Sequence, residues 1–157
     1  MNVGTALLQS AAVLGIVFLN AFFVAAEFAI VKVRGTQIES LARSGSARAR
    51  IAHHIVMHLD IYLSSCQLGI TMTSLGLGWV GEPFVASLLF PLFGGLSGDS
   101  ALMHTIAFVI AFSLITFLHI VVGEQAPKWV AIQHARGTTM FIARPLDLFT
   151  RLFRPAI

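Results

Sequence analysis

The chain has 157 residues, of which 57% are hydrophobic and only 11% are charged, with a formal net charge of +3. Soluble domains are about 45–50% apolar and about 25% charged, so a soluble fold of this size could not cover so much apolar surface. The same composition excludes disorder, collagen and coiled coil, and the few basic residues do not form the dense patch of a nucleic-acid-binding protein. The single cysteine, Cys66, excludes a disulfide framework and a thiolate zinc site. The composition predicts an all-α integral membrane protein.

Three stretches are long enough to cross a hydrocarbon core, which takes about 20 helical residues. The expected spans cover about residues 3–31, 61–93 and 101–124. The first is not a signal peptide, because no basic residue precedes it and its apolar run is too long. We expect helix breaks at Gly76 and Gly78 in the second span and at Pro127, just after the third. The fold class is therefore three transmembrane helices per chain.

The basic residues predict the orientation. All ten Lys and Arg residues follow the first or the third span, and none lies before the first span or in the 94–100 loop. The positive-inside rule makes the side that carries them cytoplasmic. We therefore expect a multi-pass protein of the cell membrane, with the N-terminus outside and the C-terminus in the cytoplasm.

Two segments outside the spans have the pattern of cytoplasmic juxtamembrane amphipathic helices, at about residues 36–60 and 128–154. Thr36 and Glu39 form a capping-box pattern at the start of the first. Trp129 lies where an aromatic interface anchor is expected in the second. A solvated connector is the alternative for the first segment.

Polar side chains inside a span are costly, so each is a candidate functional group. Asn20 and Glu27 share one face of the first span, although Glu27 is alternatively an interface carboxylate capped by a basic neighbour. Polar and small residues form two neighbouring stripes on the second span, and the third span supplies further hydroxyl candidates. These residues are Ser64, Gln67, Thr71 and Ser74 on one stripe, Ser65 and Gly69 on the other, and Ser113 and Thr116 in the third span. For any single hydroxyl, helix–helix packing is the alternative role.

The end of the third span has the chemistry of a cation site. Pro127 has no backbone N–H, and its ring crowds the carbonyl of Gly123 one turn back. Glu124, the next residue after Gly123, supplies a carboxylate. A freed carbonyl beside a carboxylate suits a hard cation such as Mg²⁺, which takes oxygen ligands. No motif for hydrolysis, phosphate binding or paired catalytic carboxylates is present, so we do not expect an enzyme.

Three stretches resemble the CNNM/CorC family, also called hemolysin-C-like. They are NAFFVAAEFAIVKVR at 20–34, CQLGITMTSLGLG at 66–78 and VGEQAPK at 122–128. The last, a Gly-Glu-x-x-Pro-Lys signature, is the most specific. Together the stretches touch all three spans, so the resemblance extends over nearly the whole chain.

The resemblance implies a dimeric three-span transport domain over residues 1–157, with a cytoplasmic belt helix after the first span. It also implies cytoplasmic CBS modules in the full-length protein, which residues 1–157 do not include. The implied activity is Mg²⁺ transport, as efflux coupled to Na⁺, from a dehydrated intramembrane site. The implied ligands are Gly123, Glu124 and Ser65. Relatives carry a serine in the first span where this chain has Phe23-Val24-Ala25, so a backbone carbonyl or Glu27 would have to replace it.

Three hypotheses follow. The first is a divalent-cation transporter, with Mg²⁺ as the expected ion and Glu124 as the charged ligand. The second is export of an organic cation such as a polyamine, which a carboxylate near Gln67 and hydroxyls could also accept. The third is a non-transporting dimeric anchor for a cytoplasmic nucleotide or Mg²⁺ sensor, in which Glu124 is a structural carboxylate.

Overall fold

The computed structural model describes residues 3–93 and 100–157. In this part of the chain all regular secondary structure is helical, as predicted. The elements are α1 (Val3–Lys32), α2 (Gly35–Arg43), α3 (Ala47–Met57), α4 (Leu59–Phe93), α5 (Ser100–Leu118), the π-helical segment η1 (His119–Gln125), α6 (Ala126–Gln133), α7 (Ala135–Phe153) and the 3-10 turn η2 (Arg154–Ala156). Apart from Ser100, the loop expected between the second and third spans lies outside the described residues.

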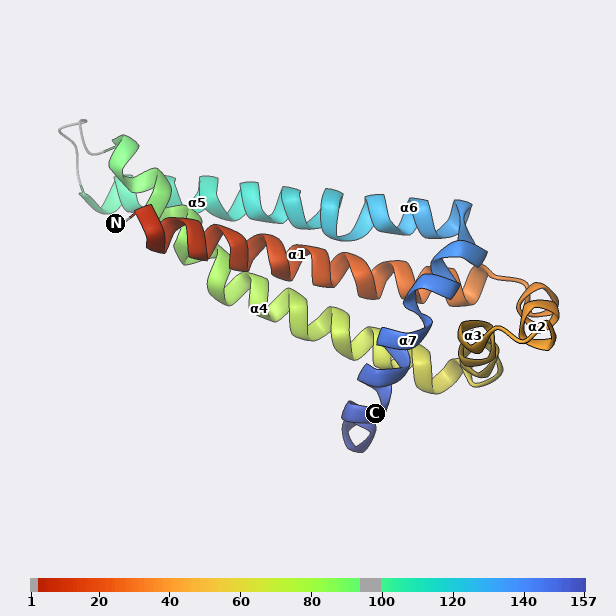
Figure 1. The fold of residues 1–157 in the computed structure, drawn as a ribbon. Helices are drawn as coiled ribbons and strands as arrows, with labels where there is room; N and C mark the ends of the chain where they lie inside the picture. Colours follow the sequence, from red (N-terminus) through yellow and green to blue (C-terminus); the bar gives the residue numbers. More distant parts are fainter. Residues whose placement is uncertain (1–2, 94–99) are drawn as a thin grey trace.

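Three long rods run side by side: α1, α4 and the continuous α5–η1–α6 (Figure 1). Helix α1 packs against α4 and against η1 and α6, so it lies at the centre of the polar contacts described below. The short helices α2 and α3 lie at the end of the rods away from the N-terminus, and α7 crosses the rods near that end (Figure 1).

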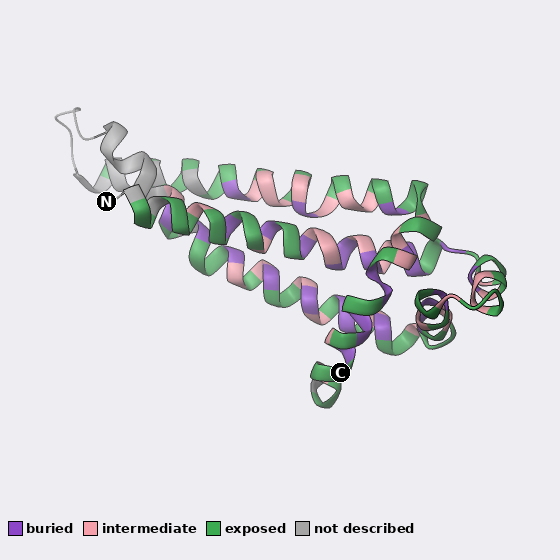
Figure 2. Cartoon of the chain, in the orientation of Figure 1, coloured by how far each residue is buried: buried purple, intermediate pink, exposed green. Residues whose placement is uncertain are grey.

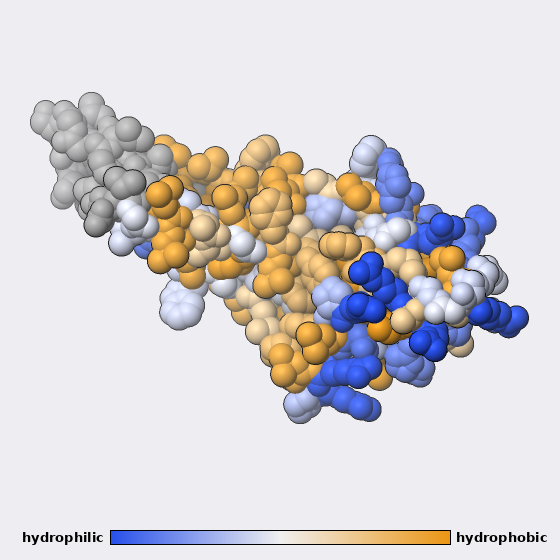
Figure 3. Space-filling model, in the orientation of Figure 1, coloured by the Kyte–Doolittle hydropathy of each residue, from blue (hydrophilic) through white to orange (hydrophobic). Residues whose placement is uncertain are grey.

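Two helical stretches in the described residues are long and apolar enough to cross a membrane, Leu7–Lys32 and Phe108–Gln133. The second extends beyond the predicted end of the third span, because the helix continues through η1 into α6. In the most apolar part of each stretch, 44% of the first is buried but only 12% of the second. Most apolar side chains of the second stretch therefore point outward. The apolar side chains gather along the rods and the hydrophilic ones at the α2–α3 end (Figure 3). Helix α4 is not one of the two stretches found among the described residues.

The predicted helix breaks at Gly76 and Gly78 are wrong, because α4 runs without interruption from Leu59 to Phe93. A helical glycine costs only about 1 kcal/mol relative to alanine, which is less than the cost of unpaired backbone groups in an apolar environment. Near Pro127 the chain does not break but changes its winding. The π-helical segment His119–Gln125 precedes the proline, which lies in the first turn of α6, where a missing N–H is tolerated.

Each predicted juxtamembrane segment is two helices. Gly45, with φ of 94°, separates α2 from α3, and the side chain of Ser46 caps α3 by accepting from the Ala49 N–H at 3.3 Å. The predicted capping box is wrong, because α2 begins at Gly35 and Arg34 occupies the N-cap position without a side-chain hydrogen bond. The second segment divides at His134, between α6 and α7.

The buried core consists of two apolar clusters, one toward each end of the rods. Figure 2 shows the buried positions along the helices. The cluster near α2 and α3 joins them to α1, α4 and α7, and includes Ile30, Ile38, Ile55, Cys66, Ile142 and Leu146. The other joins α1, α4 and α5 through Val13, Val17, Leu77, Phe84 and Ile115. Asn20 lies in α1 between the residues that belong to the two clusters.

A buried polar contact attaches α7 to the start of α4. The Tyr62 hydroxyl donates to Asp147 Oδ1 at 2.7 Å, and Arg151 Nη2 lies 2.8 Å from Asp147 Oδ2.

Tyr62→Phe is expected to lower the free energy of unfolding by about 1.5 kcal/mol. The change removes the hydrogen bond to the Asp147 carboxylate, while the ion pair of that carboxylate with Arg151 remains. Thermal unfolding in detergent measures this. Phe141→Tyr, at an exposed position of α7, is the control, and equal stability of Tyr62→Phe and the wild type would contradict the prediction.

Candidate functional site

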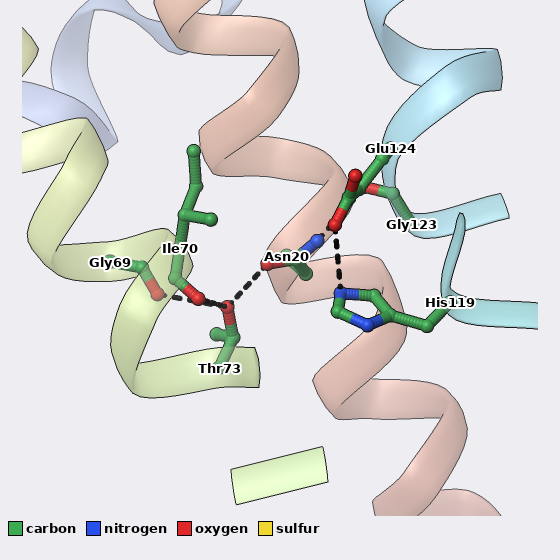
Figure 4. A network of polar contacts seen from close by, with 7 residues as sticks. All are labelled: Asn20, Gly69, Ile70, Thr73, His119, Gly123 and Glu124. Atoms are coloured by element: carbon green, nitrogen blue, oxygen red, sulfur yellow. Dashed lines mark hydrogen bonds and ion pairs between the residues drawn. The ribbon is translucent and has the colours of Figure 1, made fainter. Parts of the chain in front are cut away.

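One buried amide connects the three rods. Asn20 is fully buried in α1; its Oδ1 accepts from the Thr73 hydroxyl of α4 at 2.7 Å, and its Nδ2 donates to the Gly123 carbonyl of η1 at 3.1 Å (Figure 4). Both polar atoms of the side chain are therefore used in contacts between helices. An amide that is satisfied in this way can be buried without the penalty of an unpaired polar group.

The Gly123 carbonyl is available to Asn20 because of the local sequence. The residue four positions on is Pro127, which has no N–H to donate to it. Glycine at 123 also allows the close approach, since a Cβ there would lie 2.9 Å from His119 Cδ2 and 3.3 Å from Asn20 Nδ2. The sequence predicts that Pro127 frees the Gly123 carbonyl. In the structure this carbonyl faces the centre of the bundle, where it accepts a hydrogen bond from the Asn20 amide.

Glu124 lies next to this carbonyl and beside His119. Glu124 Oε1 is 3.5 Å from His119 Nε2, within ion-pair distance but without hydrogen-bond geometry (Figure 4). The Glu124 side chain is 39% exposed and that of His119 is 17% exposed. His119 Nε2 has no hydrogen-bond partner among the described residues. The carboxylate is therefore partly accessible, at the edge of a buried polar contact.

Thr73 is a member of this site that sequence reasoning missed. Its hydroxyl also lies within 3.0 Å of the carbonyl oxygens of Gly69 and Ile70, so its single hydrogen is shared between the Asn20 contact and local acceptors. It is buried, whereas Thr71, which the stripe analysis chose, is exposed. The available signal was Asn20 itself, because a buried amide requires a polar partner on a neighbouring helix.

Ser65, the predicted ligand in the second span, has other partners. Its hydroxyl donates to the Ile61 carbonyl at 2.8 Å and accepts from the Thr150 hydroxyl of α7 at 2.9 Å. It lies eight residues, or about 12 Å of helix, from Thr73. The structure thus places Ser65 in the attachment of α7 and away from Gly123, and its metal role stays a prediction.

The other candidates lie around the site and not in it. Ser64, Gln67 and Thr71 point outward, and with Leu63 and Leu68 they line a hollow of about 420 Å³ on α4. Their roles stay predictions, as do those of the remaining candidates. Ser74, Thr116 and Glu27 are half-buried, Ser113 is exposed, and Gly69 is packed against the Phe23 ring.

The available ligands at this site are oxygens from one carboxylate, a carbonyl and hydroxyls. The described residues contain no group of three or more His, Cys, Asp or Glu side chains that could hold a metal ion. A soft or strongly chelated transition metal would need such a group, whereas Mg²⁺ commonly binds one or two carboxylates and keeps several waters.

An apolar helical bundle joined by buried polar contacts defines a helical membrane domain. The chain belongs to the CNNM family: residues 11–157 match the family described as the cyclin M transmembrane N-terminal domain. The predicted family resemblance is confirmed.

Similar proteins occur in several bacteria. The chain is 50% identical over 151 residues to the Bacillus subtilis UPF0053 protein YugS, covering 96% of this chain and 35% of YugS. It is 52% identical over 142 residues to B. subtilis YhdT, covering 90% of this chain and 31% of YhdT. It is 39% identical over 138 residues to Mycobacterium tuberculosis Rv1841c, covering 88% of this chain and 39% of that protein. The chain thus spans about a third of the length of these relatives.

Proposed function

We propose that this chain is the membrane domain of a divalent-cation transporter, with Mg²⁺ as the exported substrate and Na⁺ as the coupling ion. The observation that carries the proposal is the adjacent pair of oxygen ligands on η1, the Gly123 carbonyl at the bundle centre and the half-exposed Glu124 carboxylate. A single carboxylate with neutral oxygens can replace part of the hydration shell of Mg²⁺ and still release the ion.

The winding of η1 supports a site at this position. Single π-helical turns inside α-helices are frequent at functional sites, because they leave backbone carbonyls outside the ordinary helical pairing. The Gly123 carbonyl has two lone pairs, of which the Asn20 amide takes one. In the proposed site, the second lone pair ligates a cation that enters beside Glu124.

The topology that we propose has three spans, α1, α4 and α5–η1–α6, with the N-terminus outside and the C-terminus in the cytoplasm. Nine of the ten basic residues lie at the end of α1, in α2, α3, α6 or α7, or in the turn η2. The tenth, Arg34, lies in the link between α1 and α2. We further propose that the domain acts as a homodimer and that, in the full-length protein, CBS modules on the cytoplasmic side regulate it.

Replacing the carboxylate tests the function. Glu124→Gln keeps the shape of the side chain but removes its charge, so we expect at least about a tenfold loss of Mg²⁺ efflux from loaded cells that express the full-length protein. Glu39→Gln, an exposed carboxylate that pairs with Arg43, is the matched control and should leave efflux unchanged. Equal efflux by Glu124→Gln and the wild type would overturn the proposal, and strong competition by a diamine would identify an organic cation as the substrate instead.

A second function, a non-transporting anchor, is favoured by one observation. Asn20 holds three rods together through contacts that a purely structural clamp would also need. The purified full-length protein in liposomes distinguishes the two functions. Mg²⁺ flux without any partner protein supports transport, whereas its absence, together with retained folding and dimerisation, supports the anchor.

A further inference from the structure

A basic cavity lies where the two candidate spans end. It has a volume of about 440 Å³ and lies between the end of α1, the start of α2 and the α6–α7 junction. Its charged or titratable lining groups are Lys32, Arg34, His134 and Arg136, and no lining residue is acidic. The cavity therefore has a formal charge of at least +3 at neutral pH.

These charges are not neutralised by neighbouring carboxylates. Two other arginines at this end of the molecule form ion pairs, Arg43 with Glu39 at 2.6 Å and Arg151 with Asp147 at 2.8 Å. Across residues 3–93 and 100–157, Lys32, Arg34 and Arg136 form no such pair. Three unpaired cations around one hollow repel one another, and an anion bound between them would remove that repulsion.

The side chains, and not the helix ends, give the cavity its positive potential. Helices α2 and α7 begin at the cavity, whereas α1 and α6 end there. The N–H groups of a first turn carry partial positive charge and the carbonyls of a last turn partial negative charge, so the two kinds of helix end oppose one another. The attraction of an anion therefore comes from Lys32, Arg34 and Arg136.

The cavity lies where both candidate spans end, which is the level at which lipid headgroups are expected. Its lining includes Lys32 and Gln133, the last residues of the two candidate spans. Large apolar side chains immediately before these ends are exposed, namely Val31, Trp129 and Val130. Exposed tryptophan at a span end is typical of the membrane interface, so acyl chains would cover these side chains while the cavity faces the headgroups.

We propose that this cavity binds the phosphate of an anionic phospholipid from the cytoplasmic leaflet. Arg34 and Arg136 provide guanidinium groups, which are suited to phosphate oxygens, and Lys32 adds a third cation. The exposed apolar side chains beside the cavity accommodate the acyl chains, which is why the structure favours a lipid over free phosphate. The proposal does not depend on which substrate the domain transports.

Lipid-dependent stabilisation tests this proposal. The purified full-length protein in neutral detergent is titrated with short-chain phosphatidylglycerol, and the shift in unfolding temperature gives an apparent affinity. For the double variant R34Q/R136Q we expect about a 30-fold weaker affinity, because each basic contact near a lipid surface contributes about a factor of five. Both arginines are exposed and repel Lys32 and each other, so the variant should unfold at the wild-type temperature or slightly above it when lipid is absent.

One control variant and two control ligands make the result specific. R48Q/R144Q removes the same charge at exposed positions outside the cavity lining and should keep the wild-type affinity. Phosphatidylcholine of the same chain length and inorganic phosphate should each stabilise much less than phosphatidylglycerol. An unchanged affinity in R34Q/R136Q, an equal loss in R48Q/R144Q, or equal stabilisation by inorganic phosphate would overturn the proposal.

Discussion

Replacing Asn20 with alanine is expected to lower the free energy of unfolding by about 2–3 kcal/mol. The change removes both interhelical hydrogen bonds of a fully buried side chain. The Gly123 carbonyl loses its side-chain donor, and an unsatisfied buried acceptor costs about 1–3 kcal/mol. The small void left by the amide adds to this cost. Thermal unfolding of the purified protein in detergent measures the change.

Two threonines on α4 provide the matched comparison. Thr73→Ala removes the buried hydroxyl that contacts Asn20 and should destabilise by about 1 kcal/mol, in the range of interhelical hydrogen bonds in membrane proteins. Thr71→Ala removes an exposed hydroxyl whose hydrogen bond, among the described residues, goes to the Gln67 carbonyl of its own helix. It should change stability by less than about 0.5 kcal/mol. Equal effects of the two changes would show that the Asn20 contact does not stabilise the bundle.

Gly69→Ala is expected to cost about 2–3 kcal/mol, because the α1–α4 contact has no room for a methyl group. A Cβ at position 69 would lie 2.5 Å from Phe23 Cδ1, well inside van der Waals contact. The Phe23 ring cannot move away easily, since it is buried and packs on Phe22 and on Phe149 of α7. Overpacking of this kind in a core typically costs about 1–3 kcal/mol.

A double-mutant cycle separates this clash from a simple change in helix propensity. Phe23→Leu makes room beside Gly69, so the double variant should be less destabilised than the sum of the two single changes. Gly78→Ala is the control on the same helix, because nothing lies within 4 Å of a Cβ there and alanine is the better helix former. Additive effects of Phe23→Leu and Gly69→Ala would contradict the assigned contact.

The helices of the fold were largely predictable, and their ends were less so. Apolar runs around Val17 and Phe112 indicate helices in lipid, because no other local structure satisfies the backbone there. The predicted breaks at Gly76 and Gly78 failed because a continuous helix pairs more backbone groups than an interrupted one. The predicted break at Pro127 failed as well, because the chain stays helical there and the π-helical segment His119–Gln125 leads directly into α6.

The candidate site was predictable only in part. Gly123, Glu124 and Asn20 could be identified as candidates, since a polar group within a span or a carbonyl freed by proline is unusual wherever it occurs. Their partners could not be identified in this way. The stripe on α4 favoured Thr71 and Ser74, whereas the residue that meets Asn20 is Thr73, because the rotation of α4 against α1 determines which face is buried.

The amino-acid order alone establishes a membrane protein of the CNNM family with its basic residues gathered into two segments, because composition, charge distribution and local motifs are properties of the chain. The tertiary structure decides which polar groups meet. Asn20 lies 53 residues from Thr73 and 103 residues from Gly123 in the chain, and only the packing of three rods brings them within hydrogen-bond distance. The tertiary structure likewise pairs Ser65 with Thr150 and places Arg34 and Arg136 around one cavity. Local patterns contain no information on such contacts, since they depend on how each helix is rotated about its own axis.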